Sequence, residues 1–173
     1  MLGYCAFGAG STGYMTFMVA YLKSDGQPAY HVSFFWTAIG LASTVAPLIW
    51  PRLLCGTRKA FAFSTLVLIN GIGAFLPLCI PSFPGAILSA LLFGSTFFAV
   101  VAATNEFVGR HVDSTQHTAA IGTFTFAFGI GQMLGPFCIG LFTDESGSLY
   151  SGLLIGALLI VVGATLPFLH RAA

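Results

Sequence analysis

The sequence GIGQMLGP at residues 129–136 repeats the spacing of small residues and proline found in GLASTVAP at residues 40–47. A second landmark recurs in the same order along the chain. FGAGST at residues 7–12 comes early in the first half, and LLFGST at residues 91–96 comes early in the second. These recurrences, at offsets of 84 and 89 residues, indicate that one ancestral unit is used twice.

A third pair of landmarks, GAFLP at 73–77 and GATLP at 163–167, closes each unit. Each unit holds three apolar segments, so we expect a single domain over residues 1–173, with repeat one at 1–80 and repeat two at 85–169. Because three is odd, the two units must cross a bilayer in opposite directions. Inverted repeats of three helices are typical of secondary transporters.

The composition is that of an integral membrane protein. The chain is 57% hydrophobic and 6% charged, whereas soluble domains are about one quarter charged. A helix needs roughly 20 mainly apolar residues to cross a bilayer. The predicted fold is therefore all-α with six transmembrane helices: Met1–Leu22, Ser33–Trp50, Ala60–Ile80, Gly85–Val108, Thr118–Phe142 and Leu149–Leu169.

The basic residues define an expected orientation. Five of the six lie on the side of the predicted bundle that also holds the C-terminus, and the positive-inside rule makes that side cytoplasmic. Both termini are then cytoplasmic, and the acidic TDESGS loop faces out. Met1 stands at the start of a span, which leads us to expect further sequence upstream. The cytoplasmic charges of interest are Arg52, Arg58, Lys59, Glu106 and Arg110.

No cofactor or metal site is expected. The four cysteines, Cys5, Cys55, Cys79 and Cys138, are scattered, and no Cys-x-x-Cys or His/Cys ligand spacing occurs. The histidines all fall in predicted loops or at chain ends. Packing inside the bilayer is the expected role of the cysteines.

Small residues four positions apart, each pair followed by a proline, mark two of the predicted spans. Such pairs allow close backbone approach between helices in lipid, and a proline bends its helix by removing one backbone hydrogen bond. A packing notch and a bending point in a moving helix are both open interpretations. The residues are Ala42, Ala46 and Pro47 in the second span, and Gly131, Gly135, Pro136 and Gly140 in the fifth.

The motif GIGQMLGPFCIG, in the span after LLFGSTFFAV, resembles the C-terminal half of the major facilitator superfamily, and more narrowly its YbfB/YjiJ-type branch. The Thr16-Phe17 pair in the first span and Trp36 and Trp50 in the second are similar to that branch. The resemblance covers nearly the whole chain. It implies a twelve-helix transporter of a bacterial inner membrane, of which these would be the last six helices.

The loop after the second predicted span departs from the superfamily pattern. The family's basic gate carries an aspartate, but WPRLLCGTRKA keeps Arg52, Arg58 and Lys59 without one. These residues are explained either by a gate of altered chemistry or by anchoring to the cytoplasmic surface.

Polar residues within the spans are candidates for the solute cavity, because lipid contact is costly for them. The resemblance implies that the first helix of each repeat lines the cavity. Threonines can instead bond back to their own helix, and amides can join helices. Thr96 and Asn105 are nine residues apart, so both cannot face one cavity squarely. The candidates are Tyr14, Thr16, Asn70, Thr96, Asn105 and Gln132.

Glu106 has two interpretations. A carboxylate in a membrane helix is a candidate for proton coupling, but Arg110 follows one turn later in the favourable order for a helix ion pair. The pair explains Glu106 without any coupling role.

The predicted function is transport of a small organic solute by alternating access, with this chain as one half of the transporter. The expected partners are the lipid bilayer, the solute, and either an N-terminal six-helix half or a second copy in a homodimer; nucleic acid is not expected. The alternatives are a non-transporting membrane subunit and an inactive transporter fragment. An intramembrane enzyme is disfavoured, because neither Gly-x-Ser-x-Gly nor His-Glu-x-x-His occurs.

Overall fold

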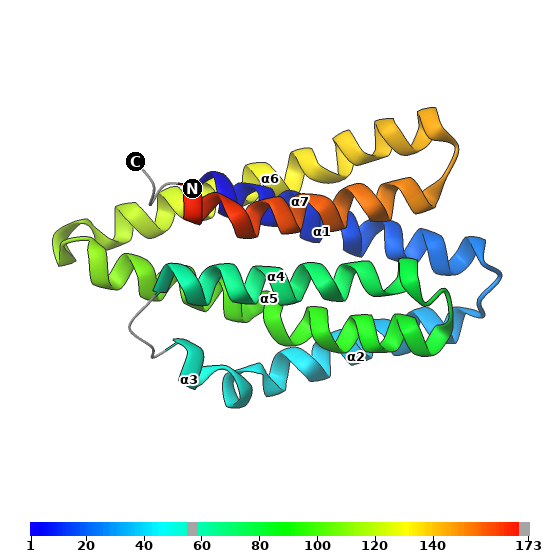
Figure 1. Cartoon of the computed structure of the whole chain (residues 1–173), viewed down its shortest axis with the longest axis horizontal. Coiled ribbons are helices and arrows are strands. Elements are labelled where there is room, and N and C mark those ends of the chain that lie inside the picture. Colours follow the sequence, from blue (N-terminus) through cyan, green and yellow to red (C-terminus); the bar gives the residue numbers. More distant parts are fainter. Residues whose placement is uncertain (55–58, 170–173) are drawn as a thin grey trace.

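The computed structural model describes residues 1–54 and 59–169, and this part of the chain is helical with short connections. Its elements are α1 (Leu2–Ser24), α2 (Ala29–Ile49), α3 (Pro51–Leu54), α4 (Lys59–Cys79), α5 (Phe83–His111), the 3-10 turn η1 (Ser114–Gln116), α6 (His117–Ser146) and α7 (Leu149–Leu169). Six of these helices are long and run roughly along one direction (Figure 1).

Within residues 1–54 and 59–169, five helices are long and apolar enough to cross a membrane: α2, α4, α5, α6 and α7. The sixth expected span corresponds to α1, which is long enough at 23 residues but falls short in hydropathy. Its glycines, hydroxyl residues and tyrosines lower that value. A lower hydropathy suits α1 because this helix packs between α6 and α7 and is less exposed than either α2 or α6.

The observed helices differ from the predicted spans at several points, and α2 begins four residues early, at Ala29 rather than Ser33. The described part of the predicted loop WPRLLCGTRKA contains a short extra helix, α3. α5 continues to His111, three residues beyond its predicted end. α6 runs to Ser146, so Asp144 and Glu145 lie in its last turn and only the end of TDESGS is a connection. Charged residues extend these helices because such ends can stand in water rather than lipid.

Local signals account for several helix ends. The Ser82 side chain accepts a hydrogen bond from the backbone N–H of Gly85, and Pro84 stands in the first turn of α5. Gly147 closes α6 with a φ of +64°, a left-handed conformation that costs glycine little. Pro47, Pro77, Pro136 and Pro167 lie inside helices that nevertheless remain continuous.

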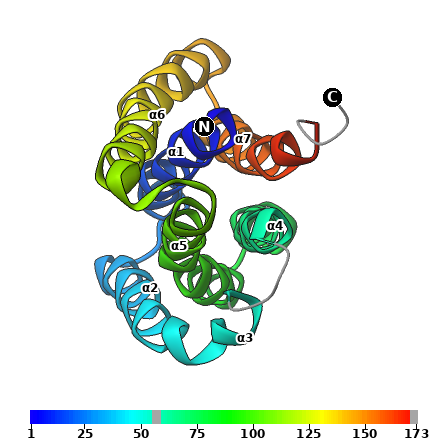
Figure 2. The same ribbon diagram turned by 90° about the vertical axis from the view of Figure 1, so that its left-hand side faces the viewer.

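The helices of the two predicted repeats exchange packing partners. α1, the first helix of repeat one, packs against α6 and α7, the second and third helices of repeat two. α5, the first helix of repeat two, packs against α2 and α4 in the same way, and α4 packs on α7. Seen end-on, α1, α6 and α7 form one group and α2, α4 and α5 the other (Figure 2).

The core lies where α1, α4, α5 and α7 meet. Its largest fully buried side chains on α1 and α5 are aromatic, with Phe7, Tyr14 and Phe93 inaccessible to solvent. Tyr14 and Phe93 stack at 4.5 Å between ring centroids. The backbones of α1 and α5 make few close contacts, so these rings fill the space between them. Aromatic side chains thus fill the interior of the bundle between α1 and α5.

Candidate functional site

Small residues bring α6 against α1. A Cβ built at Gly131 would overlap the carbonyl oxygen of Cys5, and one at Gly135 would overlap that of Ala9. Gly140 is less crowded, since a Cβ there would meet only the Phe17 ring, at 3.9 Å. Gly131 and Gly135 therefore allow close packing of α6 on α1, as expected of a packing notch.

The equivalent stretch of α2 lies against α5. Ala42 and Ala46 are buried, while Pro47 is exposed. The single hydroxyl proton of Ser43 is shared between two carbonyls, that of Ile39 in its own helix at 2.8 Å and that of Gly94 at 3.0 Å. The two glycine- and alanine-bearing motifs of the repeats thus occupy matching places, each against the first helix of the other repeat.

Tyr14 lies inside the bundle rather than on an open face. Its hydroxyl is bonded to the Ser89 hydroxyl, and Ser89 Oγ donates to the carbonyl of Gly73 at 2.6 Å. Because Ser89 uses its only proton on Gly73, Tyr14 must be the donor to Ser89. These two hydrogen bonds link α1 to α5 and α5 to α4.

Asn70 and Thr96 are also fully buried, and they bond to each other. Asn70 Nδ2 donates to Thr96 Oγ1 at 2.9 Å and to the Phe93 carbonyl at 3.1 Å. Asn70 Oδ1 has no hydrogen-bond partner among the described residues, and the same holds for the buried hydroxyls of Ser11 and Ser64. The pair fastens α4 to α5.

Thr16 and Asn105 are exposed. Thr16 Oγ1 bonds back to the carbonyl of Thr12 at 2.9 Å. Asn105 lies on the exposed side of α5 together with Phe98, seven residues earlier, whereas Thr96 is buried. The nine-residue separation noted above therefore does divide Thr96 and Asn105 between the interior and the surface.

A group of aromatic side chains was not anticipated from the sequence. We call the three partly exposed rings Phe97, Phe124 and Phe128 the aromatic shelf. Phe128 stacks on Tyr4 at 4.8 Å and lies 5.9 Å from Phe7. The available signal was the pair Phe124 and Phe128, four residues apart on α6, but only the fold brings these rings against Phe97 of α5.

Phe97 is the shelf ring that α5 contributes. Its ring lies 5.7 Å from Phe7, 5.8 Å from Phe93 and 6.4 Å from Phe128. Phe128 can approach α1 closely because residue 8 is glycine: a Cβ there would stand 2.6 Å from the Phe128 carbonyl oxygen and 2.9 Å from its ring. The shelf is therefore held from behind by buried rings.

Gln132 follows Phe128 by one turn of α6 and is half-buried. Among the described residues no hydrogen bond to its amide is found, although a primary amide has two donor protons and an acceptor oxygen. Gln132 thus differs from Asn70, whose amide donates two hydrogen bonds.

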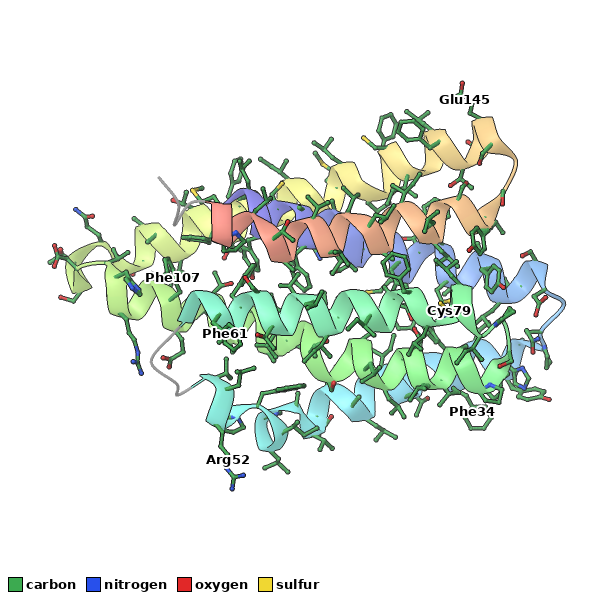
Figure 3. The ribbon with its side chains drawn as sticks, in the orientation of Figure 1. Phe34, Arg52, Phe61, Cys79, Phe107 and Glu145 are labelled. Carbon is green, nitrogen blue, oxygen red and sulfur yellow. The ribbon has the colours of Figure 1, made fainter. Side chains whose placement is uncertain are left out.

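The charged residues lie at the ends of the bundle. Figure 3 shows Arg52 and Phe107 toward one end and Glu145 at the other. Glu106 and Arg110 are half-exposed, with Arg110 Nε 3.6 Å from Glu106 Oε2. Arg58 lies outside the described residues, and Lys59 is described only as the first residue of α4. No group of His, Cys, Asp or Glu side chains in residues 1–54 and 59–169 could hold a metal.

Residues 1–167 match the family model described as "Uncharacterised MFS-type transporter YbfB". Neither the curated proteins nor the solved structures include a match to this chain.

Proposed function

Because the chain belongs to the YbfB-type family of major facilitator transporters, an integral membrane family, we propose that it moves a small organic solute by alternating access. The family match is the observation that carries this proposal. The same match argues against an enzyme, in line with the lack of Gly-x-Ser-x-Gly and His-Glu-x-x-His in the sequence.

The proposed topology has six membrane-crossing helices in two inverted three-helix repeats, with both termini in the cytoplasm of a bacterial cell. The exchange of packing partners between α1 and α5 supports it, since a two-fold relation between the repeats requires that exchange. Burial of α1 among other helices explains how a helix of lower hydropathy would be tolerated as the sixth span.

A second bundle completes the proposed transporter. Alternating access requires two bundles that rock around a central site, and a six-helix bundle supplies one wall. The partner is either an N-terminal half of the same polypeptide or a second copy of this chain. A two-fold axis along the membrane normal would give the homodimer the same arrangement.

In this scheme the solute contacts come from the half-exposed and exposed polar residues: Thr16, Asn105 and Gln132. Gln132 is the leading candidate, because its amide is half-buried and no hydrogen bond within the described residues occupies it. The bonds of Tyr14, Asn70 and Thr96 to their neighbours favour a structural role for those three.

The test measures uptake of a panel of radiolabelled neutral organic solutes into cells that make the native product, against cells that lack it. We expect uptake or efflux of at least one solute to change, and Gln132→Leu to abolish that change. Met133→Leu is the matched control, since Met133 is the next residue and 72% exposed. A normally inserted protein that changes no solute flux would favour a non-transporting subunit or an inactive fragment.

A further inference from the structure

Buried rings pack behind the aromatic shelf, and its other side is partly exposed. Tyr4, Phe7 and Phe93 are buried, and Phe97 and Phe128 stack on them. The faces or edges of the shelf rings remain partly accessible. Because the buried rings fix the orientation of the outer ones, a flat ligand ring can stack there without first ordering the side chains.

A hydrogen-bonding group stands beside the shelf. Gln132 lies one helical turn beyond Phe128 and therefore on nearly the same face of α6. Its half-buried amide lacks a hydrogen-bond partner among the described residues. An amide in this state gains most from a ligand that both donates and accepts a hydrogen bond.

The helix stretches that carry Phe97 and Phe128 have no charged side chain. The sequence has no Asp, Glu, Lys or Arg before Lys23, between Lys59 and Glu106, or between Asp113 and Asp144. Within α5, the charges of Glu106 and Arg110 are at the helix end and pair with each other. A charged ligand placed against Phe97 and Phe128 would lose its hydration with no opposite charge to replace it.

We propose that the aromatic shelf and Gln132 form the solute-binding surface of this half, and that the solute is a neutral molecule with a planar aromatic ring and an amide-like polar group. The ring stacks on Phe128 and Phe97, and the polar group exchanges hydrogen bonds with Gln132. This inference rests on the proposed function and narrows its substrate class.

The test compares two uncharged probes that differ only in their rings: 2-naphthamide and decahydronaphthalene-2-carboxamide. Their dissociation constants for the native, detergent-solubilised protein are measured by ligand-observed NMR. We expect 2-naphthamide to bind about fivefold or more tightly, as stacking on an aromatic ring allows. The anion 2-naphthoate should bind more weakly than 2-naphthamide.

Three variants locate the site. Phe128→Leu should remove the preference for the aromatic probe, and Gln132→Leu should weaken both amides while keeping the preference. Phe126→Leu is the matched control, because Phe126 is 71% exposed and about 160° around α6 from Phe128. If Phe128→Leu does not fold, as judged by circular dichroism, the Gln132→Leu and Phe126→Leu proteins still show whether 2-naphthamide binds beside Gln132 or elsewhere on α6.

Binding and transport outcomes separate the two proposals. Equal affinity for the two amides, or loss of 2-naphthamide binding in Phe126→Leu but not in Gln132→Leu, overturns the aromatic site. Selective binding of 2-naphthamide without any solute flux keeps this site and overturns the proposed transport. Flux of a solute without any ring preference keeps transport and overturns the site.

Discussion

At the scale of single residues, side-chain hydrogen bonds converge on the middle of α5. The carbonyls of Phe93, Gly94 and Ser95 accept from Asn70, Ser43 and the Trp50 indole N–H, respectively. These donors come from α4, from α2 and from the end of α2. In a lipid environment, polar groups facing other helices avoid the cost of facing hydrocarbon, and they fix which helices meet.

Tyr14→Phe tests the bond between α1 and α5. The change removes the proton that Tyr14 donates to Ser89, while Ser89 keeps its own bond to Gly73. We expect the free energy of unfolding to fall by about 1 kcal/mol, the usual worth of such a bond. Denaturation in mixed dodecyl maltoside and SDS micelles measures it. A fall above about 3 kcal/mol would mean that repacking, not the hydrogen bond, dominates.

The Asn70–Thr96 bond calls for a double-mutant cycle. Asn70→Leu and Thr96→Val each remove one partner of the 2.9 Å bond and keep the number of side-chain heavy atoms. We expect a coupling free energy of about 0.6 kcal/mol and at most about 1.7 kcal/mol, as for other hydrogen bonds between membrane helices. Asn70→Leu also removes the bond to the Phe93 carbonyl, which destabilises, and an unpaired buried oxygen, which stabilises, so the coupling and not the single change measures the bond. Zero coupling would contradict the bond.

At the scale of elements, each second helix lies against the first helix of the other repeat through small residues. In α6 these are Gly131 and Gly135, and in α2 they are Ala42 and Ala46. Glycine permits the closer approach, and the carbonyls of Cys5 and Ala9 occupy the space that a side chain would need. The tighter contact is therefore the one most sensitive to an added methyl group.

Gly135→Ala tests this contact with one added methyl group. Its Cβ would overlap the Ala9 carbonyl, so α6 must move away from α1, and we expect a loss of about 1–3 kcal/mol in unfolding free energy. Gly129→Ala is the control, because a Cβ there meets nothing within 4 Å. It should be neutral or slightly stabilising in the helix. Equal effects of the two changes would refute specific packing at Gly135.

At the scale of the whole molecule, charge separates the two ends of the bundle. α3, with Arg52, lies at the same end as the start of α1 and the end of α7 (Figure 1). Asp144 and Glu145 lie in the last turn of α6, and Glu145 is at the opposite end (Figure 3). This distribution is the physical basis of the proposed orientation, because the basic end of a membrane protein is retained in the cytoplasm.

Cysteine labelling tests the orientation. In a variant whose native cysteines are replaced by alanine, Ser24→Cys and Ser148→Cys should react with a membrane-impermeant maleimide added to intact cells. Ser114→Cys should react only after the membrane is opened, since η1 follows α5 at the basic end. The control is the variant with all native cysteines replaced by alanine and no new cysteine, provided that it folds and inserts normally. Labelling of Ser114→Cys in intact cells would invert the proposed topology.

The sequence by itself determined the helical membrane class, the family, and most helix ranges to within a few residues, because lipid demands long apolar helices and repeated small-residue motifs record their packing. It also separated Thr96 from Asn105 by helical angle alone. These features are local, or depend on one helix at a time.

Only the tertiary structure decided which polar residues are occupied and which rings meet. From the sequence, Tyr14, Asn70 and Gln132 are all candidate cavity residues. In the structure Tyr14 and Asn70 form hydrogen bonds inside the bundle, and Gln132 forms none with the described residues. The aromatic shelf joins Phe97 to Phe128, residues on helices whose backbones make few contacts. Such pairings depend on helix rotation and separation, which side-chain packing sets and hydropathy does not encode.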